Sequence, residues 1–557
     1  MAHWIGRLCC AVLAGGLLAC ESSPTTDDGD SGISADAAAP EDGATPGDQG
    51  LPPGPGEWQL PEGYFEPARM PMTLVHPRDD DAPTWAYSKN AHPGIRWEIP
   101  IVVQGGAWPF RYEIVDDGGA SGLAIGAELH RSEVDGFIVH EVTEAYGLLW
   151  WDAPVAGDYA IELRVTDQEG SEVVVPVSLR VGTEGWVFVD AEGGDDGNDG
   201  SRDAPFATLG ALYGPDGAES PYTQHRVYLS GVVPMEGNRP NGNLRIAANP
   251  APDPNLSPRI FVGMPGAGAV LEAYEGRIVL DAPGFYLANL EHRHREDYAP
   301  SGTYIHMVTA YQRTERFTLH DVTFSRFQGD PENVDLGNSS IVMFTRGAER
   351  PFVAVVGCTL TGPSGIFTST YSLRHAVFEK NRVVDAALDL ADGSVWALIY
   401  LKGDNEWVSV RANELWEGNT WNGPASALGL LEVRNVELAH NVIDTPFDSG
   451  RRGAMKLWTN SPQAGFEWTA DTPVWIHRNT LRRRMHWGGG SLANMPDGTV
   501  RISRNVSEPG SIPEHSRIVS EDNLTGEGLL DASLALTGDA RSENLGRRGA
   551  QIAVPVD

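Results

Sequence analysis

The sequence predicts an all-β protein in which a parallel β-helix follows a β-sandwich. Three observations lead to this fold class. A unit of two short apolar strands recurs along residues 304–506, and alternating strands separated by Gly-rich turns fill residues 70–181. The chain of 557 residues contains 64 Gly and 39 Pro, which is typical of a turn-rich protein. Its length predicts more than one domain, because single cores rarely exceed roughly 250 to 300 residues.

The repeated unit predicts one turn of a β-helix. Its strands alternate, so every second side chain would enter a narrow core while the others face outward. The strands are constant and only the loops vary in length, whereas helical repeats keep a fixed period. Asn side chains stacked at the end of each second strand would bond one another at a tight corner. This position is assigned to Asp321, Gly357, Asn381, Asn413, Asn441, Asn479 and Asn505. An antiparallel sandwich of short strands is the alternative, which the uneven loops disfavour.

The start of the chain has the pattern of a secretion signal. Arg7 precedes an apolar run that is too short for a permanent membrane helix. The stretch from Leu17 to Cys20 resembles the box of a bacterial lipoprotein signal. This resemblance implies removal of residues 1–19, a lipid on Cys20, and a location in the cell envelope, at the outer membrane or cell surface. A plain secretory signal cut elsewhere is the alternative. Only Cys358 lies beyond Cys20, so no intramolecular disulfide is expected.

The mature chain is expected to begin with a disordered acidic tether over residues 20–65. Residues 21–50 hold eight acidic side chains and no Lys or Arg, and such a segment cannot bury a core. The whole chain has a formal net charge of −35. This charge argues against nucleic acid as a partner, because a polyanion would be repelled over most of the surface.

Residues 66–183 predict a β-sandwich, because short alternating strands are separated by Gly-rich turns. The Gly-x-Tyr pattern at Gly157 to Tyr159 and the Thr-Asp-x-x-Gly pattern at Thr166 to Gly170 are similar to the end of cadherin-like and bacterial immunoglobulin-like modules. The resemblance implies an immunoglobulin-like fold and the role of a spacer. Ligand binding is the alternative role.

Residues 184–557 are predicted to form the β-helix. The stretch from Trp186 to Leu209 has a Val-Asp strand, an Asp/Gly/Asn loop and a Pro-Phe-x-Thr-Leu segment that would open a capping helix. It resembles the first turn of right-handed parallel β-helix proteins of the pectin-lyase-like superfamily, and Asn523 to Ile552 resembles their closing segment. The loop carboxylates suit Ca²⁺, although turns that cap a helix are the alternative. These candidate metal ligands are Asp190, Asp195, Asp196 and Asp199.

Two features point to a carbohydrate-binding surface in the later repeats. Half of the 16 tryptophans lie between Trp396 and Trp487, and aromatic rings suit sugar faces. Residues 451–486 contain seven Lys or Arg against two acidic residues, which invites an anionic polymer such as a polyuronate. Packing beneath loops and a solvated, paired face are the alternatives for these two features. The candidate substrate-binding residues are Arg346, Tyr371, Arg451, Trp458 and His477.

A row of basic and tyrosyl side chains suggests β-elimination. If Met455 and Leu457 point inward, Lys456 projects outward and shares a face with Tyr400 and Lys402, although a shift of one residue reverses the face. A cation must neutralise the uronate carboxylate while a base removes the adjacent proton. Lys456 and Arg478 are similar to the Lys and Arg pair of chondroitinase-B-like and alginate lyases, without their flanking signatures. The candidate catalytic residues are Lys456, Arg478, Tyr400 and Lys402.

Other chemistries have weaker sequence support. Val474 to His477 is similar to a pectate-lyase motif but lacks its Ca²⁺-binding Asp. Asp444 with Asp448, or carboxylates between Asp385 and Asp392, would suit glycoside hydrolysis, but loop carboxylates are common in so acidic a chain. The sequence therefore predicts a surface lipoprotein that binds an acidic polysaccharide, and it leaves open whether the protein also cleaves this polymer by β-elimination as a polysaccharide lyase. The alternatives are a non-catalytic carbohydrate-binding adhesin and a structural envelope protein.

Overall fold

The structure is a computed structural model that describes residues 67–530 with gaps. The gaps are residues 79–81, 127–129, 135–136, 143–145, 214–220, 236–243, 248–257, 275–276, 297–305, 327–338, 362–365, 387–396, 418–425, 445–452, 459–465, 470, 483–484, 488–491, 493–494, 509–511, 513 and 528. The predicted signal, Cys20, the tether and Arg451 lie outside the described residues. The described elements are strands apart from two short 3₁₀ helices, η1 (Tyr87–Lys89) and η2 (Leu209–Leu212), which confirms the all-β prediction. In this part of the chain, no helix has the length and apolar character needed to cross a membrane.

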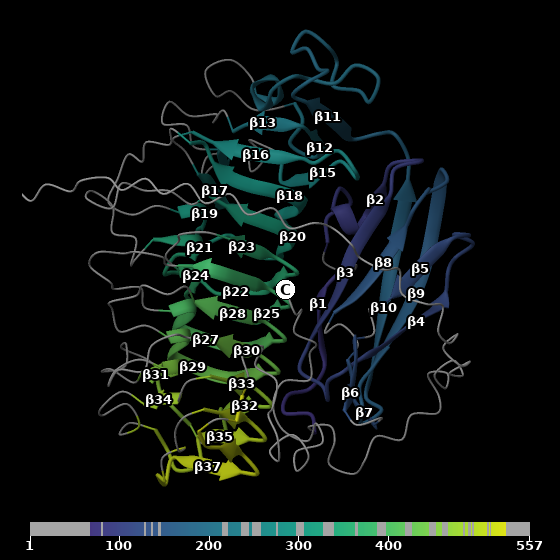
Figure 1. Cartoon of the computed structure of the whole chain (residues 1–557). Helices are drawn as coiled ribbons and strands as arrows, with labels where there is room; N and C mark the ends of the chain where they lie inside the picture. The colour runs from purple at the N-terminus through teal and green to yellow at the C-terminus, as the bar shows by residue number, and fades with distance from the viewer. Residues whose placement is uncertain are drawn as a thin grey trace, which may run out of the picture. The chain divides into compact units, whose positions relative to one another are not determined.

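The first described domain is a β-sandwich of two four-stranded sheets (Figure 1). One sheet contains β1 (Thr73–His76), β3 (Trp97–Gln104), β8 (Gly147–Trp151) and β5 (Leu123–Gly126). The other contains β2 (Asn90–Ala91), β10 (Glu172–Val181), β9 (Gly157–Thr166) and β4 (Arg111–Asp116). A separate two-stranded sheet is formed by β6 (His130–Val134) and β7 (Phe137–Val142). Strand β10 alternates as predicted, because Val175, Val177 and Leu179 enter the core while the residues between them are exposed.

The second domain is a continuous sheet of 28 parallel strands that winds into a β-helix with three faces, stacked from β11 to β38 (Figure 1). Face A contains β11 (Trp186–Asp190), β12 (Arg226–Ser230), β15 (Ile260–Gly263), the first part of β18 (Tyr286–His294) and of β20 (Phe317–Ser325), β22 (Arg350–Val356), β25 (Leu373–Glu379), the last part of β27 (Ala397–Arg411) and of β29 (Ser426–Ala439), β32 (Val474–His477), β35 (Val500–Ser503) and β37 (Ile518–Glu521).

Face B follows face A in each turn. It contains β13 (Val232–Pro234), β16 (Val270–Ala273), the last part of β18 and of β20, β23 (Thr359–Thr361), β26 (Arg382–Ala386), β28 (Glu414–Glu417), β30 (Val442–Asp444), β33 (Thr480–Leu481), β36 (Val506–Ser507) and β38 (Leu524–Thr525). Face C contains β14 (Leu244–Ala247), β17 (Ile278–Asp281), β19 (His306–Ala310), β21 (Ser340–Phe344), β24 (Ile366–Thr370), the first part of β27 and of β29, β31 (Gly453–Trp458) and β34 (Met485–Trp487).

The corner between faces A and B contains the predicted asparagine ladder. The amide nitrogen of Asn413 donates to the amide oxygen of Asn441 over 2.9 Å, and Asn441 repeats this bond to Asn479 at 2.9 Å. Each of these side chains also bonds a backbone carbonyl of the preceding turn, which satisfies buried groups that the tight corner leaves unpaired. The bonded ladder comprises Asn381, Asn413, Asn441, Asn479, Asn505 and Asn523.

The first two ladder assignments are wrong by one residue. Asp321 and Gly357 occupy the preceding corner position, where φ is +49° and +66°. Their ladder neighbours are instead Val322 and Cys358, and the backbone N–H of Cys358 donates to Asn381 at 3.1 Å. The physical reason is that this corner needs a left-handed residue, which Gly and Asp adopt at low cost, directly before the ladder position.

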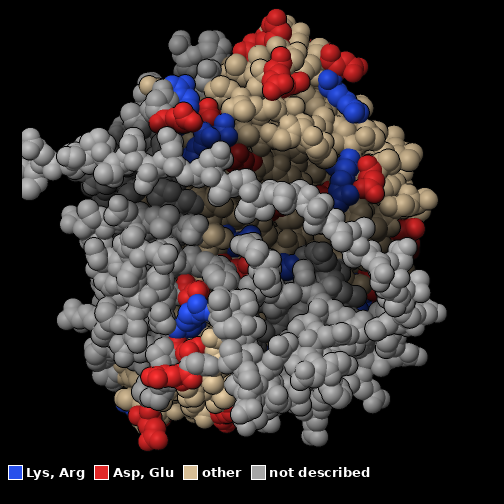
Figure 2. Space-filling model, in the orientation of Figure 1, with Lys and Arg blue, Asp and Glu red and all other residues tan. Residues whose placement is uncertain are grey.

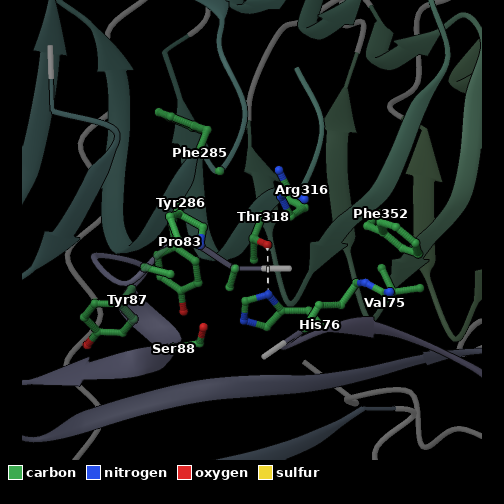
Figure 3. Close-up of a pocket in the computed structure, with 14 residues that line it drawn as sticks. Val75, His76, Pro83, Tyr87, Ser88, Phe285, Tyr286, Arg316, Thr318 and Phe352 are labelled. Atoms are coloured by element: carbon green, nitrogen blue, oxygen red, sulfur yellow. Dashed lines mark hydrogen bonds between the residues drawn. The ribbon is translucent and has the colours of Figure 1, made fainter. Parts of the chain in front are cut away.

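The sandwich packs against face A within one compact unit, Leu60–Asp557. Tyr87 of the sandwich stacks on Tyr286 with ring centroids 4.9 Å apart, and Trp97 belongs to the same apolar cluster. Figure 3 shows His76 pointing at Thr318, and the two side chains are hydrogen-bonded at 3.3 Å. The cavity beside them has about 40 Å³, which admits water but not a sugar. The spacer prediction therefore needs correction, because the sandwich covers one face of the β-helix.

A buried charge network joins the two domains. The Arg411 guanidinium donates to the carbonyl of Gly105 at 2.9 Å, to the carbonyl of Val103, and to the Glu379 carboxylate at 2.5 Å. Glu437 lies 3.9 Å from Arg411 and accepts a hydrogen bond from Ser409 at 3.1 Å. Arg411 and Glu379 have no exposed side-chain surface. Face A therefore presents charged groups whose partners come partly from the sandwich backbone.

Candidate functional site

The outer surface of face C places Tyr400 and Lys456 in one column, two turns apart. Tyr400 pairs with Gly429, which pairs with Lys456. The neighbours of Lys456, Met455 and Leu457, lie in the β-helix core, so the predicted register is the one observed. Because strands in a sheet lie about 4.8 Å apart, the two Cα atoms are roughly 10 Å apart.

Four of the predicted residues form a cluster on face C, here called the Tyr371 cluster: Arg346, Tyr371, Tyr400 and Lys402. The Lys402 amino nitrogen lies 5.0 Å from the ring centroids of both Tyr371 and Tyr400. The Arg346 guanidinium lies over the Tyr371 ring, 5.4 Å from its centroid. Strand β27 positions Tyr400 and Lys402 by its two-residue alternation, and Tyr371 directly follows β24 in the preceding turn. Both cations therefore lie near the same ring, that of Tyr371.

The Tyr371 cluster is only partly shielded from water. Arg346 is exposed, while Tyr371 and Lys402 are half-buried and Tyr400 is buried. Burial, reinforced by the charge of Arg346, lowers the pKa of Lys402 to about 8. Burial also raises the pKa of both tyrosines, and the charge of Glu432 raises them further. Glu432 is a member of the site that the sequence does not reveal, because a lone Glu after an apolar strand resembles a solvated residue.

Neither cation of the cluster forms a salt bridge within the described part of the chain. Face C therefore brings Arg346 and Lys402 to one ring without an acidic side chain in ion-pair distance of either, among the residues described. Burial lowers the pKa of Lys402, and repulsion from the positive charge of Arg346 lowers it further. An anion bound between them would relieve the repulsion.

Lys456 is buried, whereas the sequence predicts that it faces solvent. Its side chain is only 7% exposed, although its strand position points outward. The side chain of Trp458 and all of Arg451 lie outside the described residues. Of the other basic residues in the predicted positive stretch, Arg482 is described and lies 3.3 Å from Asp444. On the side of the molecule shown in Figure 2, the described Lys and Arg lie next to Asp and Glu.

The proposed pairing of Lys456 with Arg478 is not present. Lys456 lies on β31 of face C, whereas Arg478 follows β32 of face A at the corner, with φ +51° and no exposed surface. The preceding His477 is also buried, and its Nε2 lies 3.0 Å from the Glu437 carboxylate in the network below the sandwich. The 22 residues between Lys456 and Arg478 suggested that the two lie on successive strands of one face. The chain instead passes through a loop from face C to face A between these two residues.

The four candidate Ca²⁺ ligands bond the backbone of their own loop. Asp190 accepts from the N–H groups of Glu192 and Gly193, and Asp196 accepts from those of Ala207 and Thr208, the latter at 2.8 Å. Asp195 accepts from Gly197 and Asp199 from Ser201. No group of three or more potential metal ligands converges within the described ranges. Thr208 caps η2, so the capping element is a short 3₁₀ helix.

The described tryptophans do not form an exposed row. Trp475 and Trp468 are buried, and Trp407 stacks on His375 with ring centroids 6.3 Å apart. Trp396 and Trp421 lie outside the described residues, as do the side chains of Trp416, Trp458 and Trp487. Packing, the alternative given for these rings, accounts for those that can be placed.

Comparisons with known proteins show a distant likeness only. No family model matches the chain, and no curated protein matches it. Among solved structures, the chain is similar to the GH136 lacto-N-biosidase of Eubacterium ramulus. The native enzyme is 13% identical with a TM-score of 0.33, and its selenomethionine derivative is 14% identical with a TM-score of 0.31. Each alignment covers 61% of this chain and 68% of the other. A likeness this distant assigns no residue and no activity.

Proposed function

We propose that the Tyr371 cluster binds an acidic polysaccharide. The observation that carries the proposal is the pair of cations, Arg346 and Lys402, that share one tyrosine ring without an acidic partner among the described residues. A carboxylate between them would gain charge-assisted hydrogen bonds, and the ring offers a face on which a sugar packs. The chain as a whole has a net charge of −35, so two neighbouring cations without a described acidic partner stand out from it.

Replacing either cation by Ala is expected to weaken binding of a polyuronate by about tenfold or more. A hydrogen bond to a charged group contributes about 1.5–3 kcal/mol, which corresponds to this range. The measurement is isothermal titration with size-defined oligomers of galacturonate, alginate and chondroitin on Arg346→Ala and Lys402→Ala. The matched control is Arg180→Ala, which removes an exposed cation from the sandwich and the same unit of charge. Unchanged affinity in both cluster variants would exclude the Tyr371 cluster as the binding site.

The affinity should also fall as the pH rises above about 8. Burial and Arg346 lower the pKa of Lys402 to about 8, so its positive charge is complete below that pH and lost above it. The Lys402→Arg variant keeps its charge and should bind with little change between pH 7 and 9. Titrations at several pH values check this, and an identical pH dependence in wild type and Lys402→Arg would assign the effect to another group.

A second function, β-elimination at the same cluster, is supported by the pKa of Lys402. Near pH 8 a fraction of its amino groups is neutral and able to accept a proton, while Arg346 remains cationic. Arg346 would neutralise the uronate carboxylate, and Lys402 would remove the proton from the carbon next to it. The electron pair then forms the C=C bond as the C–O bond to the leaving sugar breaks, and the leaving oxygen takes a proton from water. Release of ultraviolet-absorbing unsaturated uronides would support this lyase activity, and binding without release would favour the non-catalytic adhesin.

We further propose that the protein acts at the cell surface, held by a lipid on Cys20. The support is the resemblance of Leu17 to Cys20 to a lipoprotein signal. Mass spectrometry of the mature N-terminus after expression in a bacterial host would show acylated Cys20 as its first residue. A mature chain that begins at any other residue would refute the lipid anchor.

A further inference from the structure

Histidines lie along the boundary between the sandwich and face A, in several turns of the β-helix. Those that contact the opposite domain include His76 of β1, His320 of β20, His375 of β25 and His440, which follows β29. The His320 ring lies edge-on to Tyr146 of the sandwich, with ring centroids 6.1 Å apart, and the His375 Nδ1 lies 3.0 Å from the side-chain oxygen of Gln104. The charge state of these rings therefore affects how the two domains pack.

Two of these rings, those of His76 and His320, are packed without a counter-charge. The Nε2 of His76 and the Nδ1 of His320 are buried and have no hydrogen-bond partner among the described residues. The Nδ1 of His76 lies 3.3 Å from the Thr318 hydroxyl, which is a neutral group (Figure 3). No described carboxylate lies within ion-pair distance of either ring, whereas the His477 ring lies 3.0 Å from Glu437. A proton added to His76 or His320 would therefore create a buried and unpaired charge.

The groups around these two rings do not compensate a positive charge. Glu98, whose charge favours protonation of His320, is already bonded to Arg96 and Asn289. Burial lowers the pKa of His76 to about 3, with a further contribution from the charge of His320, and burial lowers the pKa of His320 to about 4. Both rings are therefore neutral in the docked protein near neutral pH. The charged and titratable groups that surround them are Tyr87, Tyr286, Arg78, Arg316, Tyr146, Glu98 and Asp321.

The sandwich is attached more extensively to the first turns of face A than to the middle turns. At the first turns, residues 182–185 connect β10 to β11, and one large apolar cluster joins the sandwich core to Trp186 and Tyr228. His76 and His320 flank a smaller cluster at the middle turns, so a charge on them would loosen that part of the boundary first, with residues 182–185 as the hinge. This smaller cluster contains Val75, Val102 and Tyr146 of the sandwich with Ala354, Val356 and Val377 of β22 and β25.

We propose that the sandwich is an acid-released cover of face A, in which protonation of His76 and His320 separates it from the middle turns while both domains stay folded. A group whose pKa is lowered by docking destabilises the docked state once the pH falls below its ordinary value of 6.5. At pH 5 each histidine would weaken docking about 30-fold. Glu379 opposes this effect, because its pKa of about 7 favours the docked state in mild acid. Release is therefore expected below about pH 5.

The experiment measures which side chains become accessible as the pH falls. The full chain is oxidised with hydroxyl radicals at intervals between about pH 8 and 4, and mass spectrometry gives the extent of oxidation of each residue. Tyr146 and Trp108 are buried at the boundary, so their oxidation should rise severalfold below about pH 5 and fall again when the pH is restored. Trp151 of the sandwich core and Phe378 of the β-helix core should stay protected throughout.

Variants assign the effect to the named groups. His320→Gln should lower the midpoint pH of release by about one unit, and Glu379→Gln should raise it by a similar amount because the opposing group is gone. His515→Gln, which removes an exposed histidine, should leave the midpoint unchanged. His76→Gln is a second variant with the same expected direction as His320→Gln, and circular dichroism at neutral pH establishes that each variant is folded.

Three results would overturn the proposal. The first is protection of Tyr146 and Trp108 down to about pH 4, which would show that acid does not open the boundary. The second is oxidation of Trp151 and Phe378 together with them, which would show ordinary acid unfolding of the whole protein. The third is an unchanged midpoint in the folded histidine variants, which would assign the release to other groups.

Discussion

Replacing Arg411 by Met is expected to destabilise the protein by about 3–5 kcal/mol, the cost of removing one partner from a buried ion pair. Arg411 has no exposed surface and bonds the Glu379 carboxylate together with two sandwich carbonyls, those of Val103 and Gly105. The variant leaves a buried carboxylate without its cation and two backbone acceptors without a donor. The measurement is the urea unfolding midpoint followed by tryptophan fluorescence, with the slope compared between variants.

The design includes a control and a test of mechanism. Arg180→Met removes an arginine whose side chain is 64% exposed, and it should change stability by less than about 0.5 kcal/mol. The double variant Arg411→Met with Glu379→Gln should be more stable than the sum of the two single effects predicts, because the stranded charge is gone. A loss below about 1 kcal/mol in Arg411→Met would show that the network does not hold the sandwich on face A.

This network gives the sandwich a role that its sequence does not reveal. The Gly-x-Tyr and Thr-Asp-x-x-Gly patterns predict the fold of the domain from its local turn chemistry. Docking depends instead on outward residues of face A such as Ser409, Arg411 and Glu437, which look like ordinary solvated positions of an alternating strand. Whether such an outward charged side chain is buried or exposed depends on whether the sandwich covers it, and the strand's own sequence does not show this.

The β-helix itself was predictable because its requirements are local and repeated. Each corner must satisfy buried backbone groups, so Asn recurs at Asn381, Asn413 and Asn441 whatever the loop lengths are. The error at Asp321 and Gly357 arises because two neighbouring positions of the corner both select small or polar residues. The first position favours residues that adopt a left-handed backbone, and the second favours an amide side chain for the ladder. Where the second position is not Asn, as at Val322 and Cys358, the sequence does not show which residue of the pair belongs to the ladder.

The candidate site was predictable in part for the same reason. The inward side chains Met455 and Leu457 fix the register of face C, and this places Tyr400 and Lys402 on its outer surface as expected. The change of face between β31 and β32 is set by a loop, which has no periodicity, so the pairing of Lys456 with Arg478 was wrong.

Replacing Glu379 by Gln is expected to remove a pH dependence of stability between about pH 4.5 and 7. Burial, against the opposing charge of Arg411, raises the pKa of Glu379 to about 7 from an ordinary value of 4.5. A group whose pKa is raised on folding contributes stability that is fully present below its unfolded pKa and is lost as the pH rises through its folded pKa. The wild type should therefore gain up to about 3 kcal/mol relative to Glu379→Gln as the pH falls from 7 to 4.5.

The comparison with the variant isolates this group from others that titrate nearby. Buried histidines act in the opposite direction, since burial lowers the pKa of His76 to about 3 and that of His320 to about 4, but they are present in both proteins. The neighbouring Glu437 has its pKa lowered by the hydrogen bond and charge of His477, so its contribution is lost only at lower pH. Urea midpoints of both proteins at half-unit pH intervals give the difference, and Glu113→Gln, an exposed sandwich residue, controls for the loss of one charge. A wild-type advantage that is constant across this window would mean that Glu379 stays ionised beside Arg411, and that the sandwich is held on face A by a complete ion pair.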